Sequence, residues 1–219
     1  MRKIVFFLFL LSVFVNAQND STFVDNKYLE DQFYANITYI KMLNLPDPIN
    51  KTGFSYGIGF GFIKDLPVNS NRNIGFGVGL GYGLNSYYFN VKENKIEPSE
   101  TNSNELKSNK IALHTIEAPI EFRYRTSTPE KYKFWRVYPG FKIAYVFATN
   151  SKLKQREDFD VNDIIDVNDF LYGITLSTGW NKWNLHVYYG LNEVFSNSNT
   201  NSYAIDIRDL RIGLIFYIL

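Results

Sequence analysis

The sequence contains no cysteine and only two histidines in 219 residues. Without cysteine the chain has no disulfide, no thiol nucleophile, no cysteine–zinc site and no route to a lipoprotein anchor at a mature N-terminal cysteine. The histidines, His114 and His186, have no serine or aspartate at a spacing that indicates a catalytic pair. The sequence therefore predicts a protein that is not an enzyme and that uses no cofactor, with His186 as a hydrogen-bonding interior residue.

The chain also lacks a charge surplus of either sign. It has 23 lysines and arginines against 22 aspartates and glutamates. Because nucleic-acid binding needs a basic surplus or patch, we expect no nucleic-acid partner.

Long apolar runs are absent after residue 17. The run from Ile4 to Val15 is too short for a membrane helix, which needs about 20 residues. It follows Arg2 and Lys3 and precedes a small-residue cleavage site at Ala17, which predicts a cleaved signal peptide over 1–17. We expect a short periplasmic segment over 18–31 and a barrel domain over 32–219. An exported chain without membrane helices is either soluble or a membrane barrel.

Aromatic residues are abundant, with 19 Phe, 16 Tyr and 3 Trp, and the apolar residues alternate with small or polar ones. This alternation predicts strands, since successive strand residues face opposite sides of a sheet. We expect eight strands, at roughly 32–43, 52–64, 72–89, 110–125, 132–148, 169–180, 183–195 and 203–218. Each apolar face is about ten residues long, which matches the 9–11 residues of a tilted membrane strand.

The connections favour a membrane barrel over a soluble sandwich or calyx, the alternative all-β interpretation. Those after the second, fourth and sixth strands are short, whereas the others include polar stretches near 90–109 and 149–168. Short periplasmic turns and longer outer loops are typical of outer-membrane barrels. The predicted fold is all-β, an eight-stranded antiparallel up-and-down transmembrane β-barrel with both termini in the periplasm.

Glycines occupy every second position of "IGFGVGLGYGLN", residues 74–85. A dinucleotide site needs unequal spacing and a following helix, and neither is present. We instead expect inward-facing glycines on two neighbouring strands, which leave room in a narrow lumen for large side chains of the opposite wall. This glycine wall comprises Gly57, Gly59, Gly61, Gly75, Gly77, Gly79, Gly81 and Gly83.

Charged residues fall on the inward faces of three other strands. They are Glu117, Glu121, Arg123, Arg125, Arg136, Lys142, Asp209 and Arg211. A turn centred near 127–129 places Glu121 across from Arg136 and Glu117 diagonal to Lys142, so we expect ion pairs that plug the lumen. A path for protons or ions is the alternative. On the apolar face, Trp180 and Trp183 flank a two-residue turn, where an aromatic girdle is expected.

The acidic segment 158–169 matches five positions of a calcium-loop template but lacks its glycine and its final glutamate. A calcium site and a solvated outer loop both remain open interpretations of this segment.

Three features together resemble a known family: the glycine-alternating strands, the stretch "IEAPIEFRYRTSTPEKYKFWRVYPGFKIAYVF" and the closing "LRIGLIFYIL". The chain resembles the Bacteroidetes outer-membrane β-barrel family, and within it the PorT/SprT-like proteins. The family's Glu-x-Pro-Leu signature is present as Glu117-Ala118-Pro119-Ile120, and residues 125–136 are the more specific part.

The resemblance implies a location in the outer membrane of a Gram-negative bacterium of the Bacteroidetes. It also implies a non-enzymatic role in type IX protein secretion and gliding motility, as a scaffold or assembly partner. The partners implied are outer-membrane lipids and other outer-membrane or periplasmic proteins of that machinery. A porin-like transporter of small solutes, or an adhesin acting through its outer loops, are the alternatives.

Overall fold

The computed structural model describes residues 31–45, 50–51, 53–90, 109–126, 135–152, 166–196 and 207–218. The expected signal peptide over 1–17 lies outside these residues, as do 18–30 and 158–165, the greater part of the acidic segment. The polar stretch 91–108 is also outside them.

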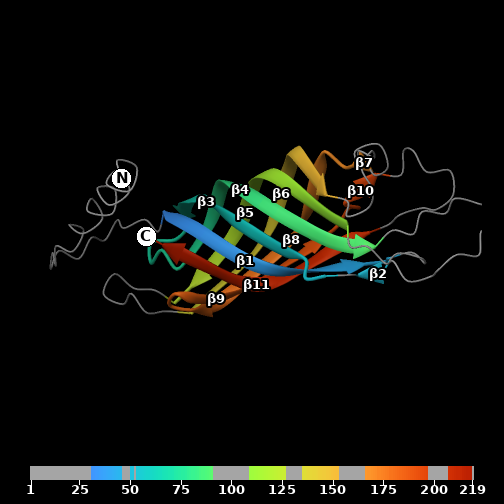
Figure 1. Cartoon of the computed structure of the whole chain (residues 1–219). Coiled ribbons are helices and arrows are strands. Elements are labelled where there is room, and N and C mark those ends of the chain that lie inside the picture. Colours follow the sequence, from blue (N-terminus) through green and yellow to red (C-terminus); the bar gives the residue numbers. More distant parts are fainter. Residues whose placement is uncertain are drawn as a thin grey trace, which may run out of the picture.

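Eight long antiparallel strands form a closed barrel (Figure 1). They are β1 (Gln32–Leu43), β3 (Tyr56–Pro67), β4 (Ile74–Asn90), β5 (Asn109–Arg125), β6 (Trp135–Lys152), β8 (Phe170–Trp180), β9 (Trp183–Gly190) and β11 (Arg208–Ile218). Each pairs with the long strand before and after it, and β11 pairs with β1 to close the ring. The predicted eight-stranded up-and-down barrel is confirmed. Among the described residues, no helix is long and apolar enough to cross a membrane.

Three two-residue strands lie at one end of the barrel (Figure 1). β2 (Asn50–Lys51) pairs with β4, and β7 (Asp166–Val167) pairs with β10 (Phe195–Ser196). We call this the loop-side end, because the connections 44–55, 91–108, 153–169 and 191–207 join the long strands there. The opposite, turn-side end has the connections 68–73, 126–134 and 181–182.

The predicted strand over 183–195 was wrong in its last residues, because β9 ends at Gly190. The Asn192 side chain makes hydrogen bonds to β8 that the backbone of a neighbouring strand would otherwise make. Its amide donates to the Phe170 carbonyl at 2.7 Å, and its carbonyl oxygen accepts from the Tyr172 N–H at 2.9 Å. The chain then turns and contributes Phe195 to β10.

The two faces of each strand differ as the alternation predicts. On β4, Phe76, Val78 and Leu80 are exposed on the outer surface, whereas Gly75 and Gly77 are buried inside. An outward apolar face suits contact with lipid, and the inward face can hold small and polar residues.

Aromatic side chains encircle the turn-side end. Trp180 and Trp183 pair across the two-residue turn and are 45% and 66% exposed on the outer surface. The Trp135 and Trp180 rings meet edge to face at 5.6 Å, so the girdle continues onto β6. Asn181 in this turn has a φ of 56°, a left-handed conformation that asparagine tolerates better than most residues.

At the loop-side end of β5, apolar side chains face inward and polar side chains face outward, the reverse of the arrangement in the middle of the barrel. On β5, Ile111 and Leu113 face inward and are buried, whereas Lys110 and His114 face outward. The inward residues join an apolar layer that includes β10 and the β9–β11 connection. It comprises Ile40, Met42, Tyr87, Phe89, Ile111, Leu113, Ala144, Val146, Leu171, Val194, Phe195 and Ile207. On β4, β5 and β6 the outward apolar band therefore ends near Leu84, Ile116 and Phe147, while Phe54 is exposed beyond that level before β3.

Candidate functional site

The eight charged residues expected in the lumen all have buried side chains. A ninth, Asp65 on β3, was not predicted and is also buried. They form two clusters stacked along the barrel axis. We call these the turn-side cluster and the loop-side cluster.

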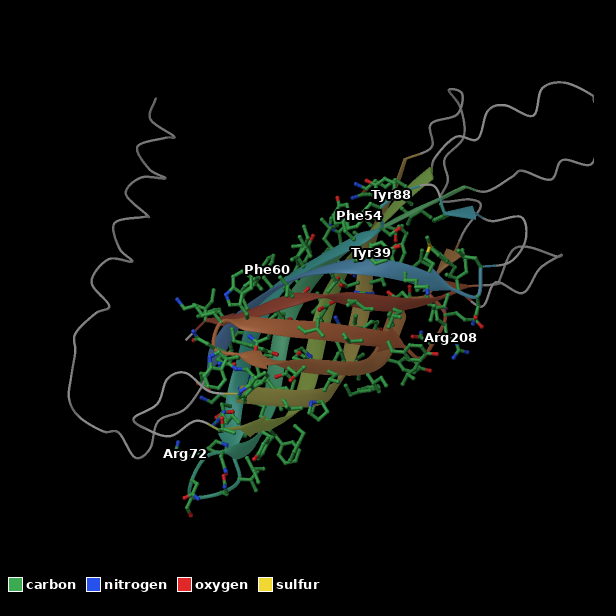
Figure 2. All side chains as sticks on the ribbon, turned by 90° about the horizontal axis from the view of Figure 1, so that it is seen from below. Tyr39, Phe54, Phe60, Arg72, Tyr88 and Arg208 are labelled. Atoms are coloured by element: carbon green, nitrogen blue, oxygen red, sulfur yellow. The ribbon has the colours of Figure 1, made fainter. Side chains whose placement is uncertain are left out.

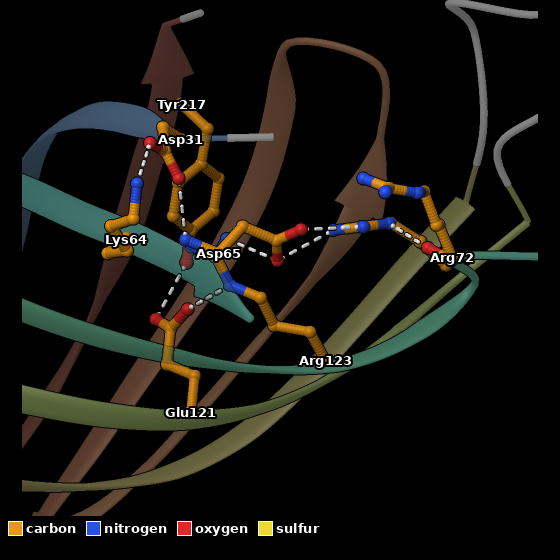
Figure 3. A network of polar contacts seen from close by, with 8 residues as sticks. Asp31, Lys64, Asp65, Arg72, Glu121, Arg123 and Tyr217 are labelled. Atoms are coloured by element: carbon orange, nitrogen blue, oxygen red, sulfur yellow. Dashed lines mark hydrogen bonds and ion pairs between the residues drawn. The ribbon is translucent and has the colours of Figure 1, made fainter. Parts of the chain in front are cut away.

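Asp65 is the centre of the turn-side cluster (Figure 3). Its Oδ1 accepts hydrogen bonds from Arg123 Nη1 at 3.1 Å and from Arg125 Nη1 at 2.9 Å. Its Oδ2 accepts from Arg125 Nη2 at 2.7 Å, so Arg125 is bidentate. The Arg125 Nε also donates to the Arg72 carbonyl at 2.8 Å, which ties the β3–β4 connection to the cluster.

Glu121 completes this cluster. Its Oε2 accepts from Arg123 Nε at 3.2 Å, and its Oε1 accepts from the Tyr217 hydroxyl at 3.0 Å. Three strands that are far apart in the sequence, β3, β5 and β11, are thereby cross-linked inside the barrel. Charges removed from water must be paired in this way to be tolerated.

The predicted position of Arg136 across from Glu121 is wrong. Glu121 pairs with Gly140, and Arg136 pairs with Arg125. The β5–β6 connection is centred beyond residues 127–129, and this shifts the register. The Arg136 guanidinium instead lies over the ring of Tyr217, 5.4 Å from its centroid, where a cation–π interaction stabilises it.

The loop-side cluster contains two close ion pairs, and a longer contact of 3.9 Å between Arg211 Nη1 and Glu117 Oε1 joins them. Lys142 Nζ donates to the two Glu117 oxygens at 3.1 and 3.0 Å, the diagonal arrangement expected from the sequence. Arg211 Nε donates to Asp209 Oδ2 at 2.6 Å, and Arg211 Nη1 donates to Asn85 Oδ1 at 2.6 Å. The Tyr188 ring contacts both cations at 4.7 Å, so it joins the two pairs.

The glycine wall leaves space for the charged side chains of these clusters. We expected side chains of the opposite wall to fill this space, but side chains of neighbouring strands fill it. A Cβ on Gly83 would lie 2.5 Å from Glu117 Oε1, and one on Gly77 would lie 2.6 Å from Arg123 Nε. A Cβ on Gly81 would collide with the Tyr34 hydroxyl. Glu117 and Arg123 are on β5 beside β4, and Tyr34 is on β1 beside β3. Long side chains of the flanking strands thus lean over the glycines.

A serine–histidine pair was missed by the sequence analysis. Ser177 Oγ lies 2.8 Å from His186 Nδ1, because the two residues are directly opposite in the β8–β9 hairpin. Both side chains are buried inside the barrel, at 0% and 5% exposed, so a substrate in solvent cannot reach them. Within the described ranges, no group of three or more His, Cys, Asp or Glu is placed to hold a metal ion.

An exposed ion pair lies outside the lumen at the turn-side end. Asp31 accepts from Lys64 Nζ at 2.9 Å and from the Asp65 N–H at 2.8 Å (Figure 3). Slight burial acts to raise the pKa of Asp31, but these hydrogen bonds outweigh it and hold the pKa below its ordinary value.

A family comparison agrees with this architecture. Residues 16–196 match the family model described as outer membrane protein beta-barrel domain. The chain belongs to this outer-membrane β-barrel family. No curated protein matches the sequence.

Family membership places the barrel in the outer membrane and assigns the outward apolar band to lipid. Because barrels of this kind keep short turns on the periplasmic side, we expect the turn-side end to face the periplasm. The family match ends at residue 196, yet β11 beyond it closes the outer-membrane β-barrel and contributes Asp209 and Arg211 to the lumen.

Proposed function

We propose that this protein is a non-enzymatic scaffold or assembly partner in the outer membrane, and that it serves type IX protein secretion and gliding motility. The observation that carries the proposal is the filled interior. Two ion-paired clusters and an apolar layer occupy the lumen in series. An eight-stranded barrel has an interior just wide enough for side chains to fill, so a folded protein cannot pass through it.

The work of such a barrel is done by its outer surface and its two rims. The same filling argues against the porin-like alternative, because each lumen carboxylate already has a cation as its partner. The assignment to type IX secretion rests on the PorT/SprT-like resemblance of Glu117–Ile120 and residues 125–136. The burial of Ser177 and His186 supports a non-enzymatic role.

We expect the purified protein to give no stable single-channel currents in planar lipid bilayers. The reason is that, over the described residues, the ion pairs of both clusters and the apolar layer fill the lumen. A general porin inserted under the same conditions is the positive control. Long-lived conductance steps from the folded protein would contradict the scaffold proposal and favour the porin-like alternative.

Deletion of the gene is expected to abolish export of type IX substrates and to stop gliding. The proteins in the culture medium and the movement of single cells are the two measurements. Expression of the wild-type chain from a plasmid should restore both. Normal export and motility in the deletion strain would overturn the type IX assignment, while loss of surface attachment alone would favour the adhesin.

A further inference from the structure

Tyr56, Tyr88 and Lys110 form a cluster on the outer surface of three adjacent strands, β3, β4 and β5. Backbone pairing brings them together, since Tyr56 pairs with Ser86 and Tyr88 pairs with Lys110. Figure 2 shows Tyr88 at the same end of the barrel as Tyr39 and Phe54, far from Arg72 at the turn-side end. We call the three residues the rim cluster.

The rim cluster lies at the loop-side limit of the apolar band. Leu84 and Ile116 of the same strands still face outward as apolar residues, and beyond them Tyr88 and Lys110 face outward, with the exposed Phe54 near Tyr39 at the same end. This level is where the lipid headgroups of the outer leaflet meet the barrel.

The geometry presents a positive charge on an aromatic platform. Lys110 Nζ is 5.7 Å from the centroid of the Tyr56 ring and 5.4 Å from that of Tyr88. The two rings are tilted by 34° with centroids 6.4 Å apart. Within the described part of the chain, this ammonium contacts the two tyrosines. Neither ring carries a negative charge that would neutralise the lysine.

A further polar group lies between the rim cluster and the apolar band. His114 is on the same face, four residues along β5 from Lys110 and opposite Leu84. Its two ring nitrogens are fixed by Tyr82 and Asn150, at 2.6 and 3.0 Å. Lys110 is thus a positive charge above a hydrogen-bonded histidine and the lipid-facing side chains of the band.

We infer that the rim cluster binds the phosphate of a phosphorylated glycolipid headgroup in the outer leaflet, with Lys110 as the anion-binding residue. Three features select this occupant. The ammonium complements a phosphate, the tyrosine rings provide flat surfaces and hydroxyls for a sugar, and the apolar band below receives the acyl chains. This site depends on the outer-membrane location and not on the type IX role.

The test uses the full-length folded protein, stripped of lipid and titrated with lipid A in mild detergent, with bound lipid counted by native mass spectrometry. Lys110→Gln is expected to weaken lipid A binding about five- to tenfold, the effect of one lysine at a charged surface. Lys182→Gln, at the exposed β8–β9 turn on the opposite rim, is the matched control and should bind as the wild type does.

Tyr88→Leu is a second variant, which removes the platform and keeps the charge, and it should also weaken binding. Dephosphorylated lipid A should bind the wild type as weakly as lipid A binds Lys110→Gln. Equal binding by the Lys110 and Lys182 variants, or equal binding of both lipid forms, would overturn the inference. So would full displacement by millimolar inorganic phosphate, which would indicate a site for a free anion.

Discussion

Asp65→Asn is expected to lower the free energy of unfolding by about 3–5 kcal/mol, the range for breaking a buried ion pair. The carboxylate of Asp65 contacts both Arg123 and Arg125, and all three side chains are fully buried. Without it, two guanidinium groups remain close together with one carboxylate, that of Glu121, in the cluster. Urea unfolding in lipid vesicles, followed by fluorescence of the three tryptophans, measures the change.

Asp31→Asn is the matched control for Asp65→Asn, because it removes one carboxylate at the same end of the barrel. The Asp31–Lys64 pair is open to solvent, with side chains 29% and 54% exposed. Exposed pairs contribute at most about 1 kcal/mol, so this variant should unfold almost as the wild type does. Similar small losses for both variants would contradict the central role given to Asp65.

Gly81→Leu is expected to destabilise the barrel by about 3 kcal/mol, the upper end of the cost of overpacking a core. A side chain at this position would meet the Tyr34 hydroxyl, and its Cβ would lie 2.7 Å from the Phe60 carbonyl oxygen. The backbone oxygen cannot move without opening the β3–β4 ladder. The fraction of folded barrel on an unheated gel measures the effect.

Gly53→Ala is the milder comparison for the glycine substitution. Gly53 is exposed and lies outside the strands, and an added Cβ would meet the Tyr88 side chain at 3.0 Å but no backbone atom. A double variant separates packing from backbone effects. Gly81→Ala combined with Tyr34→Leu should be less destabilised than the sum of the two single changes, because the leucine removes the colliding hydroxyl. A Gly81→Leu protein as stable as the wild type would show that the glycine wall is not needed for space.

The fold could be predicted because lipid outside and a narrow lumen inside impose opposite demands on successive residues. Residues 74–85 show this alternation directly, with a glycine at every second position. The Glu117–Lys142 pair could also be predicted, because a diagonal contact tolerates an error of one or two residues in the turn. The Glu121–Arg136 pair could not, since a directly opposite contact requires the exact centre of the β5–β6 connection.

Asp65 was missed for a similar reason. The predicted strand ended at Lys64, one residue before the position that turns the carboxylate into the lumen. His186 was expected as a hydrogen-bonding interior residue, and it is one. Its contact with Ser177 was missed because that contact depends on the register of a hairpin rather than on any motif. The apolar layer at the loop-side end was also missed. It includes Phe195, which lies in the β9–β11 connection, where the sequence does not alternate as a long strand does.

The closed interior has a consequence for the cell as a whole. A barrel with an open pore adds to the leakiness of the envelope with each additional copy, so its abundance is limited by the toxic solutes that it admits. Among its described residues, the interior of this barrel is filled by paired charges and apolar side chains. Additional copies of a filled barrel therefore add less to that leak than additional copies of an open one.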